Sequence, residues 1–421
     1  MATANITTTI THTPYDIIVV GGGIVGLTCA NALLHAAPTS KIALVEGGSL
    51  TSQWQAEHYD LRVSAITRAS QNILTNLQAW SHIENTRLNP YHHMLVWDTY
   101  GRIQFNAAEL NQTDLGHIIE NSAIVDALHQ SLRRHNNVTF YLNNLLQQMQ
   151  VHADHVTVTL TDATQLQAKL VIAADGAHSW IREHARFEVN SRDYWHYALV
   201  ATVKTEKSHN QTAMQRFFDS QSIFKAGGTL AFLPLNDPHF CSIVWASDPH
   251  RIVEMQQTDT KTCQAMLTQL FDAHLGEVEL VSQRVVFPLK MRHAVDYVKP
   301  RIALIGDAAH TIHPLAGQGV NLGILDATVL AQVLSPLLQQ RADIGELATL
   351  KRYQRWRKLH NTSMVKAMTG FKQLFGSSQP LVRHLRGLGL NLVDHLPPVK
   401  QLFMQQALGL MPDLPKLALP Q

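Results

Sequence analysis

One short segment near the start of the chain limits the fold more than any other. Asp16–Val20 is an apolar run with the length of a buried strand, and Gly21-Gly-Gly-Ile-Val-Gly26 follows it at once. Gly21, Gly23 and Gly26 have the spacing of a dinucleotide-binding fingerprint. In such a fingerprint the first glycine permits a tight turn, the second lets a pyrophosphate approach, and the third lets a helix pack closely. We therefore predict a Rossmann-like domain whose first helix runs from Ile24 to about Ala36.

The next strand ends in an acid at the distance that this fold requires. Lys41–Val45 is apolar, and Glu46 follows 20 residues after Gly26. A carboxylate there accepts hydrogen bonds from both hydroxyls of an adenosine ribose and disfavours a 2′-phosphate. The segment therefore favours FAD or NAD over NADP. An ordinary strand–turn–helix unit is the alternative interpretation.

Two later strands also end in a glycine and an acid. Leu170–Ala174 is followed by Asp175-Gly176, and Ile302–Ile305 is followed by Gly306-Asp307. Ligands bind at the carboxyl ends of strands in open α/β sheets. The second strand leads through a turn-rich segment into an apolar helix, whose first amides are unpaired and suit an anion. This segment and the start of its helix contain Pro314, Gly317, Gly319, Val320 and Asn321.

The pattern of elements predicts an α/β fold with two domains and a helical tail. A chain of 421 residues is too long for one small core. Between about 187 and 295 the helix–strand alternation gives way to successive β runs, which indicates a mostly antiparallel sheet. We predict a discontinuous nucleotide-binding domain (14–90, 110–186 and 296–340), an inserted substrate domain (91–109 and 187–295) and a C-terminal helical segment (341–421).

Composition excludes several classes of protein. A net charge of +2 gives no case for nucleic acid as a partner. The 24 His are scattered, and none lies in a His/Cys cluster with metal-ligand spacing, so we predict no metal site. Three cysteines in apolar surroundings suggest a reducing compartment. No apolar run reaches about 18 residues, so we expect no membrane span and a cytoplasmic protein.

The three motifs together resemble a known family. Gly21–Gly26 with Glu46, then Asp175-Gly176, then Gly306-Asp307 stand in the order of the flavoprotein aromatic hydroxylases, the single-component FAD monooxygenases. The string from Gly306 to Gly323 looks like the ubiquinone-biosynthesis branch. His313 and the stretches Leu115–Asn121, Leu230–His239 and Cys241–Trp245 are similar to the bacterial 2-polyprenylphenol hydroxylases, which oxidise ring position five. Similar segments run through nearly the whole chain.

The resemblance implies an aromatic hydroxylase fold and a role for each motif. Gly21, Gly23 and Gly26 would hold the FAD pyrophosphate, Glu46 its adenosine ribose, and Asp307 its ribityl or pyrophosphate region. Asp175 and Gly176 would serve both FAD and the nicotinamide donor. Arg62 and Asn121 would lie near the flavin or its phosphates, although Ser122-Ala123 replaces a basic residue that the family often has there. The amides of Gly319, Val320 and Asn321 would face the pyrimidine edge of the flavin.

The implied reaction uses NAD(P)H and dioxygen as co-substrates. NAD(P)H would reduce FAD, and a flavin hydroperoxide would transfer OH to a phenol ring. Pro314 and Gly317 would border the reacting face. His310 and His313 are candidate bases for the phenol, and a structural hydrogen-bonding role is the alternative for each.

The implied substrate is a polyprenylphenol lipid, and the implied partners are other ubiquinone-biosynthesis proteins. A basic helical tail after Leu347 suggests peripheral contact at the inner face of the cytoplasmic membrane, although a solvated face is an alternative. A homo-oligomer stays open. Two other functions also stay open: hydroxylation of another ring position in the pathway, and a flavin-binding scaffold of a quinone-synthesis assembly. No two tryptophans lie two residues apart, which sets a halogenase aside.

Overall fold

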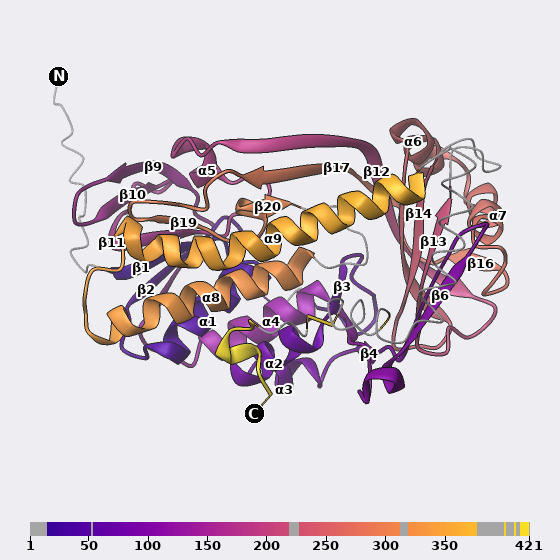
Figure 1. The fold of residues 1–421 in the computed structure, drawn as a ribbon, viewed down its shortest axis with the longest axis horizontal. Helices are drawn as coiled ribbons and strands as arrows, with labels where there is room; N and C mark the ends of the chain where they lie inside the picture. The colour runs from indigo at the N-terminus through magenta and orange to yellow at the C-terminus, as the bar shows by residue number, and fades with distance from the viewer. Residues whose placement is uncertain are drawn as a thin grey trace, which may run out of the picture.

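The computed structural model describes residues 15–51, 54–218, 227–311, 319–376, 400, 408–409 and 413–420, with backbone only at 192–194 and 364–376. These residues form three sheets with helices around them (Figure 1). An eight-stranded sheet A and a nine-stranded sheet C lie at the two ends of the molecule, and a three-stranded sheet B lies near sheet C.

Sheet A has a parallel centre. Its order is β18–β19–β11–β1–β2–β8, and β10 and β9 continue from β11 as antiparallel strands. The central strands are apolar along their length because helices and loops cover both faces. Their bounds are β1 Tyr15–Val20, β2 Ile42–Glu46, β8 Val138–Leu142, β9 Leu146–Val151, β10 Val156–Leu160, β11 Gln165–Ala173, β18 Val298–Lys299 and β19 Ile302–Leu304.

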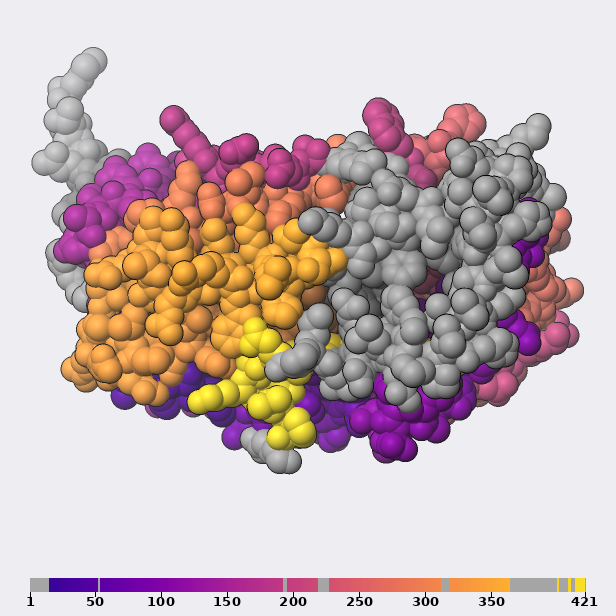
Figure 2. All heavy atoms as spheres, viewed as in Figure 1, coloured from indigo at the N-terminus to yellow at the C-terminus, as the bar shows by residue number. Residues whose placement is uncertain are grey.

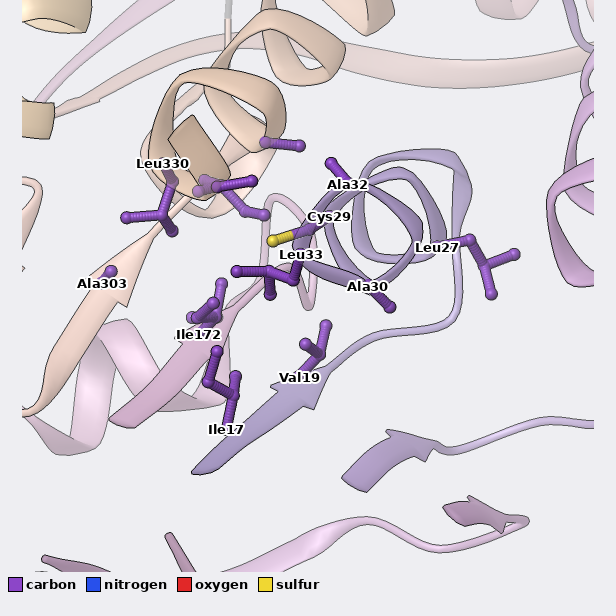
Figure 3. Close-up of a cluster of buried hydrophobic side chains, with 14 of the residues drawn as sticks. Ile17, Val19, Leu27, Cys29, Ala30, Ala32, Leu33, Ile172, Ala303 and Leu330 are labelled. Atoms are coloured by element: carbon purple, nitrogen blue, oxygen red, sulfur yellow. The ribbon is translucent and has the colours of Figure 1, made fainter. Parts of the chain in front are cut away.

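Two long-separated helices pack together over sheet A. Helix α1 (Ile24–Ala36) follows β1, and α8 (Gly319–Gln339) packs against it. Figure 3 shows side chains of β1, α1, β11, β19 and α8 meeting in one apolar core, among them Ile17, Leu33 and Leu330. Helices α2 (Arg68–Asn76), α3 (Trp80–Ile83), α4 (Asn121–Leu132) and α5 (Trp180–His184) complete this half.

Sheet C is mostly antiparallel. Its order is β20–β17–β12–β15–β14–β13–β5–β6, with β16 beside β12. Helices α6 (Pro249–Gln257) and α7 (Thr260–Leu270) pack on its outer side (Figure 1). The strands are β5 His93–Trp97, β6 Arg102–Asn106, β12 Val189–Thr205, β13 Thr212–Phe218, β14 Gly228–Pro234, β15 Phe240–Ser247, β16 Val278–Leu280, β17 Val285–Ala294 and β20 His310–Thr311.

Sheet B and the tail join the two halves. Sheet B contains β3 Val63–Ile66, β4 Leu88–Pro90 and β7 His117–Glu120. Helix α9 (Leu347–Gly376) runs from β18 of sheet A to β13 of sheet C. Residues 413–420 include a 3-10 turn at Lys416–Ala418 and lie below α9 on the same face (Figure 2). Short 3-10 turns also occur at Ala107–Leu110 and Gly306–Ala308.

Helix α8 is a core helix. Within the described residues it is the one helix long and apolar enough to cross a membrane, but 72% of its most apolar window is buried inside the protein. It carries Pro336 in its last turn.

Several predicted elements are confirmed and one prediction is wrong. The strands at the fingerprint and at Glu46, and the helix Ile24–Ala36, lie where they were expected. The amphipathic pattern from Ser70 to Trp80 also predicts a single helix, and this is wrong because Gln78 adopts φ +59° and separates α2 from α3. The successive strands expected between 187 and 295 are present, and two short helices, α6 and α7, cover one face of the sheet that they form. The predicted domain bounds stay a prediction.

Replacing Gly26 by alanine tests the packing of the fingerprint. A Cβ at Gly26 would lie 1.9 Å from the carbonyl oxygen of Gly21. This oxygen belongs to the backbone, so it cannot move away as easily as the end of a flexible side chain. We expect Gly26→Ala to lower the free energy of unfolding by about 2 kcal/mol or more, because overpacking forces the backbone to shift. Thermal melting of the cofactor-free protein measures this, and a melting temperature equal to wild type would contradict it.

Candidate functional site

The fingerprint turn leaves an open space beside one of its glycines. Gly21 has φ +108°, and a Cβ there would lie 2.3 Å from the carbonyl oxygen of Ala174, which directly follows the neighbouring strand β11. At Gly23, by contrast, a Cβ would meet no protein atom within 4 Å. Gly21 and Gly26 are therefore required by packing, whereas Gly23 faces a space that a ligand can enter.

Glu46 lies against this turn, as predicted. Its Oε2 accepts a hydrogen bond from the amide of Gly22, and its Oε1 accepts one of 2.8 Å from the amide of Gly48. These bonds hold the end of β2 against the glycine turn. The carboxylate is half-buried and each oxygen keeps a further lone pair, so it can still accept hydrogen bonds from hydroxyl groups.

The two acid–glycine motifs meet at the same edge of sheet A. Strand β11 pairs in parallel with β1 and with β19, so their carboxyl ends lie side by side. Arg182 ties them together: its Nη1 donates to the carbonyl of Ala308 (3.0 Å) and its Nη2 to that of Ala177 (2.7 Å). Arg182 is only 4% exposed, and burial together with nearby Arg292 lowers the pKa of its guanidinium. No pattern in the sequence marks this arginine as part of the site.

Asp175 has one oxygen without a partner among the residues described, and Gly176 and Gly319 each have open space beside them. Oδ2 of Asp175 accepts from the amide of Ile181 (3.2 Å), while its buried Oδ1 has no hydrogen-bond partner among the residues described. Burial raises the pKa of this carboxyl, although Ser179 and the amide of Ile181 oppose the effect. Gly176 has φ +80°, and a Cβ there or at Gly319 would meet nothing within 4 Å. An unsatisfied acceptor beside open space fits a bound group with donors.

Asp307 follows β19 at the carboxyl end of that strand. Its side chain is exposed to solvent, while nearby protein raises the pKa of the carboxyl by desolvation, an effect that His310 and Arg182 oppose. An exposed carboxylate at this end of the parallel strands is accessible to a ligand that carries hydrogen-bond donors.

The start of α8 is anchored by the side chain of Asn321. Its Nδ2 donates to the carbonyl of Ala65 (2.8 Å), and its Oδ1 accepts from the amide of Thr67 (3.1 Å). The side chain therefore ties α8 to β3 and is not available to a ligand, while the amides of the helix start remain the candidate contact. Gly319 and Val320 are half-buried at that start.

Arg62 and Asn121 are neighbours. The amide of Asn121, the first residue of α4, donates to the carbonyl of Arg62 (2.9 Å). The Arg62 side chain is exposed, whereas Oδ1 of Asn121 accepts from the hydroxyl of Ser64 (2.7 Å). The structure brings both residues to the amino end of α4, next to sheet B.

His310 belongs to a buried ion-pair network centred on Asp326. Oδ2 of Asp326 lies 2.5 Å from Nε2 of His310 and also accepts from the amide of Gly306 (3.1 Å). Oδ1 accepts from Arg357 (2.7 Å) and Asn361 (3.1 Å). Burial would raise the pKa of Asp326, but His310 and Arg357 outweigh it and hold that pKa well below its usual range. His310 is 2% exposed, which favours the structural role over direct contact with a substrate.

The structure thus gathers most predicted residues at one edge of sheet A. Asp326, Arg182 and Arg357 were missed because no local pattern marks a buried partner that is distant in sequence. His313, Pro314 and Gly317 lie outside the described residues. The residues that the structure brings together are Gly21, Gly23, Gly26, Glu46, Asp175, Gly176, Gly306, Asp307, Gly319 and Asn321.

Comparison with known proteins agrees with this geometry. A family model described as "FAD binding domain" matches residues 14–368. The chain belongs to this family of FAD-binding proteins. A 3-demethoxyubiquinol 3-hydroxylase of Escherichia coli is 35% identical over 402 residues, covering 95% of this chain and 100% of that protein. The human mitochondrial ubiquinone biosynthesis monooxygenase COQ6 is 31% identical over 440 residues, covering 94% and 92%.

Solved structures confirm the predicted aromatic hydroxylase fold. The p-nitrophenol 4-monooxygenase PnpA of Pseudomonas putida superposes with a TM-score of 0.76 at 19% identity, covering 94% of this chain and 98% of that one. An HpxO variant of Klebsiella pneumoniae complexed with FAD gives 0.72 at 18% identity, covering 94% and 99%. The predictions of an FAD-dependent monooxygenase related to ubiquinone-biosynthesis hydroxylases, with NAD(P)H and dioxygen as co-substrates, are confirmed.

Sheet C divides its aromatic side chains between two faces. Phe218, Phe232 and Trp245 pack in the core beneath α6 and α7. Phe287 lies on the opposite face with Ala198, Ala246 and Leu289. Alternation along the strands therefore places these aromatic side chains on opposite faces of the sheet.

Replacing Gly23 by alanine separates cofactor binding from folding. A Cβ at Gly23 points into the open space and touches no protein atom. We expect Gly23→Ala to melt at the wild-type temperature without FAD and to bind FAD at least about tenfold more weakly, since a methyl group would displace a closely approaching pyrophosphate. Titration of the cofactor-free protein with FAD, followed by flavin fluorescence, measures the affinity. Unchanged affinity would exclude Gly23 from the site.

Half-buried His293 is expected to lower the stability of the folded protein in acid. Burial lowers the pKa of His293 to about 4, His310 and Lys358 add to this, and Asp326 opposes it. A histidine in the unfolded chain has a pKa of about 6.5. Between this pH and the lower pKa of the folded state, the side chain is protonated in the unfolded chain and neutral in the folded chain. Stability is therefore lost as pH falls from about 6.5 to about 4, by about 1–3 kcal/mol from this group after allowing for its partial exposure.

His293→Gln tests this pH dependence. Glutamine does not titrate and can still hydrogen-bond the hydroxyl of Tyr297, which lies 2.9 Å from Nε2 of His293. We expect the melting temperature of this variant to fall less than that of wild type between about pH 7 and about pH 4.5. His35→Gln, at an exposed position on α1, is the control and should follow wild type. Identical slopes for both variants would contradict the assignment.

Proposed function

We propose that this protein is an FAD-dependent monooxygenase that hydroxylates the aromatic ring of a polyprenylphenol in ubiquinone biosynthesis, using NAD(P)H and dioxygen. One observation carries the proposal. Gly23, Gly176 and Gly319 come from three separate motifs, and each faces open space at the edge of sheet A where ligands bind in such folds. The ubiquinone-biosynthesis names of relatives that span nearly the whole chain support the substrate class.

The residues of the open edge suit the parts of FAD. The turn at Gly21–Gly26 accommodates the pyrophosphate, and Glu46 accepts hydrogen bonds from the adenosine ribose. The exposed carboxylate of Asp307 and the Oδ1 of Asp175, which has no partner among the residues described, accept from the ribityl chain or nearby groups. Arg62 and Asn121 approach from the amino end of α4. Reduced FAD supplies the activation of dioxygen.

The start of α8 contributes electrostatics. The first amides of α8, at Gly319, Val320 and Asn321, and the partial positive charge at the start of this 21-residue helix favour negative charge near them. In the proposed complex they face the pyrimidine edge of the flavin and stabilise charge that develops there. Pro314 and Gly317 are proposed to border the reacting face, and His313 is the candidate base, since His310 is buried in its pair with Asp326.

The proposed phenol lies between this edge and the inner face of sheet C. A polyprenyl tail belongs to a bilayer, so the protein must dock at a membrane or receive the lipid from pathway partners. We propose peripheral contact at the inner face of the cytoplasmic membrane.

Two ring positions are candidates for hydroxylation. The motifs around Leu115–Asn121, Leu230–Trp245 and His313 support ring position five. The 35% identical relative carries the name of a 3-demethoxyubiquinol 3-hydroxylase, which supports the position that its name states. Both proposals share the cofactor site and differ in the orientation of the ring.

The decisive experiment joins turnover with product analysis. We expect purified, FAD-loaded protein to oxidise NAD(P)H faster when a short-chain 2-polyprenylphenol is present, and to yield a product heavier by one oxygen atom. Rapid mixing without oxygen measures flavin reduction, and mass spectrometry with NMR of the product after oxygen is admitted gives the ring position. A demethoxyubiquinol analogue, tested in parallel, serves the second candidate.

The outcomes separate the hypotheses. Hydroxylation of one substrate but not the other selects the ring position. A yellow protein that retains FAD but hydroxylates neither substrate would exclude the enzyme proposal and favour the scaffold.

A further inference from the structure

Residues 54–62 form a wall between the two ends of the proposed cofactor site. Upstream, Leu50 lies 3.0 Å from a Cβ built at Gly22 of the fingerprint. Downstream the chain enters β3, whose Ala65 is bonded to Asn321 at the start of α8. The segment therefore leaves one end of the site and returns to the other. Residues 55–58 are exposed, so packing alone does not hold them in place.

A single arginine holds this wall by its backbone. Nη1 of Arg87 donates to the carbonyl of Ala56 (2.7 Å), and Nη2 donates to those of Gln55 (2.7 Å) and His58. The same guanidinium makes a forked contact with Glu120, through Nε (3.0 Å) and Nη2 (2.9 Å). Such a fork matches the planar donors of arginine and no other side chain.

Aromatic side chains of the wall enclose the arginine. Its Cζ lies 4.4 Å from the ring centre of Tyr59 and 5.2 Å from that of Trp54. The hydroxyl of Tyr59 donates to Asn236 (2.6 Å), and its ring packs on Phe240 of β15. The wall thus contacts both the FAD-binding half and the substrate sheet.

Glu120 connects this arrangement to residues predicted to approach the flavin. It is 2% exposed and accepts from Nε1 of Trp54 (3.0 Å) and from the amide of Asp60 (2.6 Å). Asp60 in turn accepts from the amides of Arg62 (2.9 Å) and Ser122 (3.2 Å). A chain of bonds therefore runs from Arg87 through Glu120 and Asp60 to Arg62 and the first turn of α4.

We propose that Arg87 is a positioning residue that latches residues 54–62 against the cofactor site and thereby slows the release of FAD. The latch does not touch the cofactor itself. It rests on the FAD site of the proposed function and is independent of the substrate and of the ring position hydroxylated.

Arg87→Lys is the test variant, because lysine keeps the charge but cannot form the fork. From FAD-loaded full-length protein we expect FAD to dissociate about tenfold faster, in the range usual for coupled sites. Dilution of the holoprotein and recovery of flavin fluorescence measure the rate. Glu120→Gln removes the charge of the partner while keeping its shape, and should also accelerate release.

Arg301→Lys is the matched control. Arg301 is also buried. Its guanidinium makes a forked contact with the carboxylate of Asp343 and donates to the carbonyls of Ala153 and Lys169. It precedes β19 and therefore lies at the opposite end of this strand from Gly306. A general loss of stability would affect both variants, whereas the latch predicts faster FAD release in Arg87→Lys alone.

Proteolysis supplies a readout that does not depend on activity. Glu57 is exposed in the wall, so endoproteinase Glu-C should cut after it about fivefold faster or more in Arg87→Lys than in wild type, since removing the fork raises the population of open loop. Saturating FAD should slow the cut in both proteins. Unchanged FAD release together with unchanged cleavage in a folded Arg87→Lys protein would overturn the latch, as would equal effects in Arg301→Lys. Absence of FAD binding in wild type would instead overturn the proposed function.

Discussion

The carboxylate of Asp326 is the charge around which the edge of sheet A that carries the proposed cofactor site is built. It is fully buried, and the cost of removing a carboxylate from water is several kcal/mol unless partners surround it. Gly306, His310, Arg357 and Asn361 supply those partners from the β19 turn, β20 and α9, while Asp326 itself lies on α8. Because each donor is needed, the network admits one arrangement of these elements. The segment that carries Asp307 is held at both ends by the same carboxylate.

The proposed cofactor site follows from a division between rigid support and open space. Gly21 and Gly26 must be glycines, because a Cβ at either position would clash with backbone atoms. At Gly23, Gly176 and Gly319 a Cβ would instead point into open space. Buried hydrogen bonds from Arg182 and Asn321 join motifs that are more than a hundred residues apart. The edge of sheet A is thus preformed, and a ligand that enters it finds acceptors already oriented.

Much of the fold could be predicted from the sequence, because its signals are local. The strand, glycine turn, helix and acid at the fingerprint depend on spacing within about thirty residues, and the structure confirms them. The helix break at Gln78 could not be predicted, because its left-handed backbone conformation is one that glycine usually marks, and here the residue is glutamine. Asp326 and Arg182 were missed for another reason. An acid or arginine in a sequence does not reveal a partner that only the tertiary fold brings near.

The missed residues share a physical character. Arg182, Arg357 and Arg87 each join carbonyl or carboxylate oxygens from separate elements with one planar side chain. A buried ion pair of this kind adds little net stability, because desolvation offsets much of the attraction. Its geometric demand is strict, however, since every donor must find an acceptor in the plane of the guanidinium. The arginines therefore specify how the motifs sit relative to one another, while the apolar core of β1, α1 and α8 provides the stability against which that arrangement is held.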